Sequence, residues 1–213
     1  MTGGRAVRSI RIAVIGAAGR TGRCLIAAAA TRGHEISALA RHPDSIAGLP
    51  AVVNLVAGDG RDPAAVAQVI RGADAVVSAI TGSNHRGTTQ LTDVTRTVLA
   101  AMTATGVDRL IVTSAYPVIA HQPRLPMAVL HRVFRHAYTD AARMEELVAA
   151  SRVAWTIARL NRLTNGPAIG SIITTPELIA RPRAISRADV AETLVNLITD
   201  PSAERLALNI SGT

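Results

Sequence analysis

Three glycines between an apolar run and an alanine-rich stretch carry the clearest chemical signal in the sequence. The segment GAAGRTG occupies positions 16–22, directly after the run 10–15. In such a pattern the first glycine permits a sharp turn, the second lets the backbone approach a pyrophosphate, and the third allows close helix packing. Free amides at the positive end of the following helix would face the phosphates. We therefore predict that a dinucleotide is bound by Gly16, Ala18, Gly19, Arg20, Thr21 and Gly22.

The residue after the second apolar run indicates which dinucleotide fits. An NAD-specific site usually has Asp or Glu there, which holds the ribose 2′-hydroxyl. This chain has no acid at that point and has Arg41 instead. A guanidinium suits a 2′-phosphate through paired, charge-assisted hydrogen bonds, and Arg20 could close on the same phosphate. A solvated loop charge is the alternative for Arg41. We expect NADP(H) to be preferred over NAD(H).

The composition excludes several classes of function. All 23 basic residues are arginine, and the formal net charge is +8. The arginines are scattered and only 2% of residues are aromatic, so we expect anionic small molecules and no nucleic acid as partners. Without lysine, Schiff-base chemistry is excluded. Cys24 is the one cysteine, and His131 and His136 lie five apart with no further ligand nearby, so we expect no metal.

The sequence has no membrane-spanning run and no signal-peptide core, so we expect a cytoplasmic protein without a membrane partner. Apolar runs alternate with amphipathic stretches, as in a parallel sheet covered on both faces. Strands are predicted at 10–15, 36–40, 52–56, 73–79, 110–113 and 154–158, with helices at 20–31, 63–70 and 88–105.

This alternation predicts an α/β fold, a Rossmann doubly wound parallel sheet of order 3-2-1-4-5-6 with a small C-terminal substrate lobe. Residues 1–9 are expected to be a flexible tail and 10–213 a single domain. The proline- and glycine-rich segment 161–185 is its substrate side. Ser186 to Asp189 reads as a capping box that opens a helix to about 199, and 206–210 as a final edge strand.

Several longer segments resemble a known group of proteins. Besides GAAGRTG and LARHP, they are VAGDGRDPAAVAQVIRGADAVVSAITG, GVDRLIVTSA, MEELVAASRVAWTIARL and ISRADVAETLV. Together they resemble the atypical short-chain dehydrogenases, and within them the NAD(P)H-binding NmrA-like and flavin or biliverdin reductase-like proteins. The likeness extends from residue 10 over almost the whole chain.

The resemblance implies that the ends of later strands also hold the dinucleotide. Ser114 corresponds to a serine that related enzymes keep near the reacting carbonyl. The family usually has Arg-Pro-Gly where this chain has Arg159-Leu160-Asn161. The implied cofactor contacts are Gly58, Asp59, Ala79, Ile80, Thr81, Gly82, Thr113, Ser114, Ala115, Asn161, Arg162 and Leu163.

The catalytic pair of the mainstream short-chain dehydrogenases, Tyr-x-x-x-Lys, is absent, because alanine stands four residues after both Tyr116 and Tyr138. Two functions remain open. One is an NADPH-dependent reductase of a flat acceptor such as a flavin, quinone or tetrapyrrole, with the proton from solvent, Ser114 or Tyr116; a packing role is the alternative for Tyr116. The other is a non-catalytic NADP(H)-binding redox sensor of NmrA-like type. We expect a monomer or weak homodimer.

Overall fold

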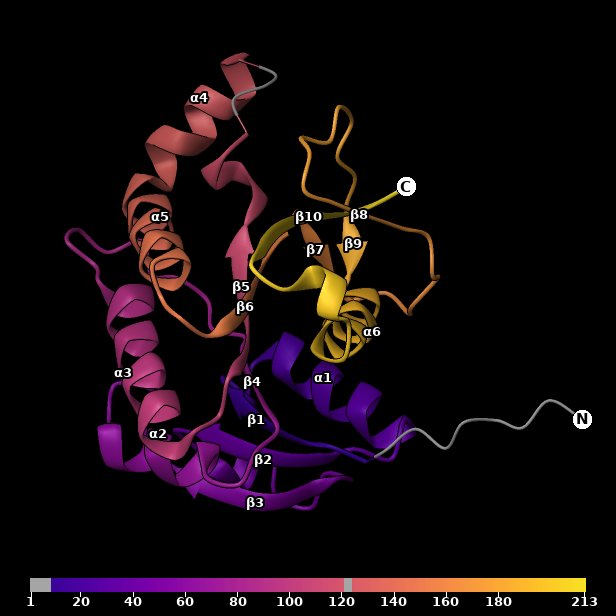
Figure 1. Cartoon of the computed structure of the whole chain (residues 1–213). Helices are drawn as coiled ribbons and strands as arrows, with labels where there is room; N and C mark the ends of the chain where they lie inside the picture. The colour runs from indigo at the N-terminus through magenta and orange to yellow at the C-terminus, as the bar shows by residue number, and fades with distance from the viewer. Residues whose placement is uncertain (1–8, 121–123) are drawn as a thin grey trace, which may run out of the picture.

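The computed structural model describes residues 9–120 and 124–213, and ten strands lie within these ranges. Eight of them form one central sheet in the order β3-β2-β1-β4-β5-β6-β10-β8, and β7 pairs with β9 (Figure 1). The strands are β1 (Arg11–Ile15), β2 (Glu35–Ala40), β3 (Val52–Ala57), β4 (Ala75–Ser78), β5 (Arg109–Ala115), β6 (Ala154–Leu160), β7 (Leu163–Thr164), β8 (Ile172–Thr175), β9 (Ile185–Ser186) and β10 (Leu206–Gly212).

Helices cover both faces of this sheet. The face that α1 and α6 cover contains one apolar core, and the face under α2, α3 and α5 contains the other, while α4 extends beyond the sheet (Figure 1). The helices are α1 (Arg20–Thr31), α2 (Pro63–Ile70), α3 (Gln90–Thr105), α4 (Arg124–Val133), α5 (Arg135–Ala149) and α6 (Arg187–Ile198), with short 3₁₀ turns η1 (Pro43–Ser45), η2 (Tyr116–Val118) and η3 (Pro201–Ala203).

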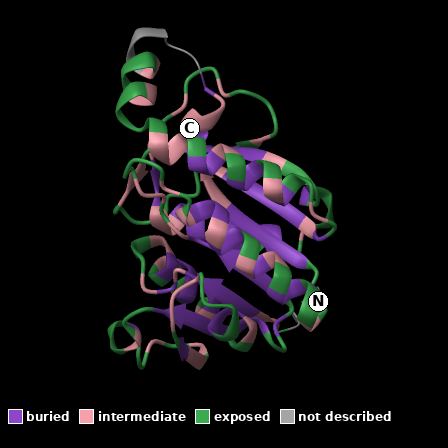
Figure 2. Ribbon diagram, turned by 90° about the vertical axis from the view of Figure 1, so that its left-hand side faces the viewer, coloured by how far each residue is buried: buried purple, intermediate pink, exposed green. Residues whose placement is uncertain are grey.

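Burial on both faces explains why the strands are continuous apolar runs. In β1, residues 12–15 are at most 1% exposed, and all four residues of β4 are buried. Figure 2 shows these buried strands under helices that are exposed on their outer sides. Such strands pair in parallel and leave all their carboxyl ends at one edge of the sheet.

Glycines end two of the helices at the predicted places. Gly33 follows α1 with φ +70°, and Gly106 follows α3 with φ +73°. This left-handed conformation costs glycine little, which makes it the usual residue after a helix end. The observed ends of α1 and α3 are therefore those predicted from the sequence, and the bounds of α2 also match the prediction.

The predicted strand order 3-2-1-4-5-6 is confirmed, but the last strand is not at the edge. β10 pairs in parallel with β6 and antiparallel with β8, so it is internal. The edge strand β8 comes from the segment 161–185, which therefore contributes to the main sheet. Eight residues of the predicted tail, 1–8, lie outside the described residues. Within the described ranges, no helix combines the length and hydropathy needed to span a bilayer.

Candidate functional site

The turn between β1 and α1 depends on its glycines. Gly16 has φ +87°, and a Cβ there would lie 2.9 Å from the carbonyl oxygen of Ala79. The amide of Gly19 donates to the carbonyl of Gly16 at 3.0 Å and closes the turn. A Cβ on Gly22 would overlap the carbonyl oxygens of Gly16 and Ala17. The third glycine therefore lets the helix rest on the turn itself, close to the end of β1.

The first turn of α1 is left open for a ligand. Gly19 occupies its N-cap position, no side chain caps it, and its first turn has no acid. In contrast, the side chains of Asp62 and Ser186 cap α2 and α6. The uncapped amides and the positive end of the helix dipole suit an anion.

A first cavity of about 270 Å³ opens beside this turn. It lies at the carboxyl ends of the first four strands, where the strand order reverses and where ligands of doubly wound sheets bind. Its lining residues are Ile15, Gly16, Ala18, Gly19, Leu39, Ala40, Arg41, Gly58, Asp59, Gly60, Arg61, Ala79, Ile80, Thr81, Gln90 and Val94.

Charged side chains gather at the β2 and β3 end of the first cavity. Arg61 donates through Nε to Oδ1 of Asp59 at 2.9 Å and through a terminal nitrogen to Oδ2 at 3.1 Å. These bonds, with the Arg61 amide and the nearby Arg41, lower the pKa of Asp59 to about 2. Asp59 thus stays ionised and neutralises Arg61. Among the described residues Arg41 has no ion-pair partner, so its charge is available to a ligand.

A second cavity of about 310 Å³ continues from the first along the shared residues 79–81. Most of its wall is apolar, with hydroxyl and amide groups at the ends of β5 and β6. It is lined by Thr21, Ala79, Ile80, Thr81, Gly82, Leu91, Thr113, Ser114, Ala115, Phe134, Ala137, Tyr138, Ala141, Leu160, Asn161 and Leu163. The two cavities together suit a ligand with a charged end and an apolar end.

Ser114 connects this second cavity to a buried ion pair. Its Oγ donates to Oε1 of Glu145 at 2.6 Å. Arg159 donates to both oxygens of the same carboxylate, with distances of 2.6 to 3.2 Å. The side chains of Glu145 and Arg159 are 9% and 17% exposed. Because Ser114 and Arg159 are register partners on β5 and β6, both can reach α5 from the same face of the sheet.

The two tyrosines are placed differently. The hydroxyl of Tyr116 donates to the carbonyl of Ile179 and accepts from its amide, each at 3.0 Å, and this side chain does not line the second cavity. Tyr138 does line it, and in the described part of the chain its hydroxyl has no hydrogen-bond partner. Burial raises the pKa of Tyr138, which keeps the phenol protonated.

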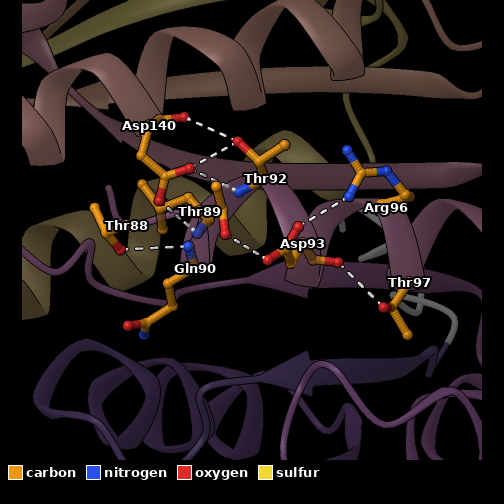
Figure 3. Close-up of polar contacts among 9 residues, drawn as sticks. Thr88, Thr89, Gln90, Thr92, Asp93, Arg96, Thr97 and Asp140 are labelled. Carbon is orange, nitrogen blue, oxygen red and sulfur yellow. Dashed lines mark hydrogen bonds and ion pairs between the residues drawn. The ribbon is translucent and has the colours of Figure 1, made fainter. Parts of the chain in front are cut away.

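Two side chains fix the elements around the second cavity. Asp140 of α5 accepts from the amides of Leu91 and Thr92 at 2.8 and 3.1 Å and from the Thr92 hydroxyl at 2.7 Å, so it caps α3 (Figure 3). Asn84 donates to the carbonyl of Val133 at 2.6 Å, which ties the loop after β4 to the end of α4.

Most of the sequence-predicted contacts lie together at these two cavities. Arg20, Gly22, Arg162 and Tyr116 do not line either of them. Arg20 and Arg162 are exposed next to lining residues, and Gly22 supports the turn. No group of three or more His, Cys, Asp or Glu side chains suited to a metal occurs in residues 9–120 and 124–213.

Comparison with known proteins gives the family. The profile of a family described as NAD(P)H-binding matches residues 16–201, which include six of the eight strands of the main sheet and every lining residue of the two cavities except Ile15. The chain belongs to this NAD(P)H-binding family. The NAD(P)H-binding family that the resemblance implied is thereby confirmed.

Several solved structures share the fold of this chain. An NAD-dependent epimerase/dehydratase from Bacillus halodurans has 21% identity and a TM-score of 0.81, covering 96% of this chain and 95% of its own. A short-chain dehydrogenase/reductase from Veillonella parvula in complex with NADP has 18% identity and a TM-score of 0.80, with the same coverage. ChuY, an anaerobilin reductase from Escherichia coli O157:H7, has 22% identity and a TM-score of 0.76, covering 95% of this chain and 97% of its own.

Among curated proteins, the chain is similar to the uncharacterized protein Rv2047c of Mycobacterium tuberculosis. The two are 40% identical over 119 residues, which is 54% of this chain. The matched part is only 13% of the length of that relative.

The site contains residues that the sequence alone did not indicate. Phe134 and Tyr138 both line the second cavity. Arg61 joins the first cavity, and its position two residues after Asp59 could have indicated the pair. Glu145 reads as an ordinary helix acid, and only its contact with Ser114 reveals its place.

Proposed function

We propose that this chain is an NADPH-dependent reductase that transfers hydride to a flat acceptor. The observation that supports this most is the continuity of the two cavities. The first offers uncapped amides and Arg41 to the phosphates, and the second offers an apolar wall and few polar groups. NADPH bound across both would supply a hydride from its nicotinamide ring at the second cavity.

The glycine turn fits such a cofactor on a specific ground. A Cβ at any of its three glycines would come within 3.1 Å of a backbone oxygen, so the tight turn needs glycine, and this turn places the uncapped start of α1 beside the first cavity, where a pyrophosphate would lie. Arg41 would take the 2′-phosphate, because the nearby Asp59 is already engaged by Arg61. This arrangement supports a preference for NADP(H) over NAD(H).

The two proton donors expected from the sequence are both engaged, which favours an acceptor that needs little acid catalysis. Ser114 donates its hydrogen to Glu145, and Tyr116 is held by the backbone of Ile179. A flavin, quinone or tetrapyrrole can stack on the nicotinamide so that geometry supplies most of the rate, and water can supply the proton. Phe134 and Tyr138 provide aromatic contact area for such a ring, and the Tyr138 hydroxyl can bind its edge.

The test is oxidation of NADPH by the purified chain with FMN, riboflavin, a quinone and a linear tetrapyrrole. We expect turnover with at least one of them. The variant Phe134→Ala, which removes an aromatic side chain from the lining of the second cavity, should raise KM for the acceptor. Tight NADPH binding with no turnover on any of these acceptors would contradict the reductase and would favour the non-catalytic redox sensor.

A further inference from the structure

The direction of one hydrogen bond at the second cavity determines what Ser114 can offer a ligand. A carboxylate only accepts hydrogen bonds, so in the contact with Glu145 the hydrogen belongs to Ser114. A hydroxyl has one hydrogen and two lone pairs. With its hydrogen directed at Glu145, the Ser114 oxygen faces the cavity with lone pairs alone.

The ion pair between Glu145 and Arg159 holds the Ser114 hydrogen bond in this direction. Arg159 donates from Nε to Oε1 and Oε2 of Glu145 at 3.2 and 3.0 Å, and from a terminal nitrogen to Oε2 at 2.6 Å. Because these contacts reach both oxygens, they hold the orientation of the carboxylate as well as its charge. Neither Glu145 nor Arg159 lines the cavity, so a ligand would meet this network only through the Ser114 oxygen.

We propose that Glu145 is a positioning residue that makes Ser114 a hydrogen-bond acceptor, so that the bound ligand must present an N–H or O–H group to it. This inference rests on the proposed function. It changes the role of Ser114 from a proton donor to a group that selects the orientation of a ligand. The matching donor comes either from the carboxamide of the nicotinamide or from an N–H of the acceptor.

The variant Glu145→Gln tests the direction of the bond. A glutamine keeps the shape, accepts from Arg159 through its oxygen, and turns its NH₂ toward Ser114. Ser114 then accepts from this NH₂ and points its own hydrogen into the cavity, where it opposes a ligand donor. Ser114→Ala removes the acceptor altogether, and Glu146→Gln is the matched control, because Glu146 is the exposed neighbour on the same helix.

The measurement compares ligand pairs that differ by one donor. The first pair is NADP⁺ and its 3-acetylpyridine analogue, in which a methyl replaces the carboxamide NH₂. The second pair is riboflavin and N3-methylriboflavin, measured with NADP⁺ bound. Calorimetry should show that the wild-type chain prefers the donor-bearing member of one pair by about fivefold, the value of one ordinary hydrogen bond.

Both Ser114→Ala and Glu145→Gln should abolish this preference, and Glu146→Gln should keep it. The double variant should behave as Ser114→Ala does, because Glu145 acts only through Ser114. A structural role for Glu145 would instead weaken both members of a pair equally. If Glu145→Gln does not fold, Ser114→Ala makes the same comparison without disturbing the ion pair.

Two results would overturn the inference. One is equal affinity of the wild-type chain for both members of both pairs. The other is a preference that survives in either Ser114→Ala or Glu145→Gln. Failure of the wild-type chain to bind any dinucleotide would be a different result, since it would overturn the proposed function itself.

Discussion

At the scale of single residues, charged side chains distinguish the first cavity from the second. Asp59 and Arg61 satisfy one another, whereas Arg41 is exposed on the rim of the first cavity. Position 41 was predicted from its place after the second strand. The pairing of Arg61 with Asp59 was not predicted, although their spacing of two residues could have indicated it.

We expect Arg41→Ala to remove the discrimination between the two dinucleotides. The wild-type chain should bind NADPH at least tenfold more tightly than NADH, because a guanidinium and a 2′-phosphate form charge-assisted bonds worth about 1.4 kcal/mol or more. The variant should bind both with similar affinity in calorimetry. Arg71→Ala, at the far end of α2, is the control and should keep the preference. Equal affinities in the wild-type chain would contradict the assignment.

A second residue-scale prediction concerns His34, which is 4% exposed. Burial, and then the charge of Arg32, lower the pKa of His34 in the folded chain below the 6.5 of the unfolded chain. Below pH 6.5 the unfolded state therefore binds a proton that the folded state does not. The free energy of unfolding should be fully retained above pH 6.5 and should fall as the pH drops toward the folded-state pKa.

Urea unfolding of the wild-type chain and His34→Gln at several pH values measures this effect. Glutamine does not titrate, so the part of the stability loss due to His34 should be missing in the variant. The same slope of unfolding free energy against pH in both proteins would refute this account of His34.

At the scale of elements, the helix starts differ in whether a side chain accepts from their first amides. The starts of α2 and α6 are capped by side chains from their own sequence, and α3 is capped by Asp140 from α5. Local caps such as Asp62 and Ser186 can be predicted from sequence, and the helices that follow them were predicted. The cap on α3 joins residues far apart in the chain, so no local pattern reveals it.

We expect Asp140→Ala to destabilise the fold by about 2–4 kcal/mol, because it leaves two buried amides and a hydroxyl without their charged acceptor. Chemical denaturation at neutral pH measures this loss. Asp93→Ala removes a half-buried acid, with a side chain 39% exposed, from the same end of α3, and it should cost about 1 kcal/mol or less. Similar losses for both variants would show that Asp140 does not stabilise the start of α3 as described.

At the scale of the whole molecule, the alternation of apolar runs and helices predicted six strands in their correct order. It failed where the sheet is completed by non-local pairing. The short strand β8 lies in a segment rich in glycine and proline, and nothing near it in sequence indicates its antiparallel contact with β10. The prediction of the second cavity was incomplete for the same reason, because Phe134 and Tyr138, which line it, lie at the start of α5, far from the glycine turn in the sequence.

Residues 79–81 line both cavities, so one short segment contributes to the walls of each. A change in the position of this segment therefore alters both cavities at once. Under the proposed function, the space for the acceptor and the fit of the nucleotide depend on the same three residues. An engineer who enlarges the acceptor side by moving this segment would have to re-establish nucleotide recognition at the same time.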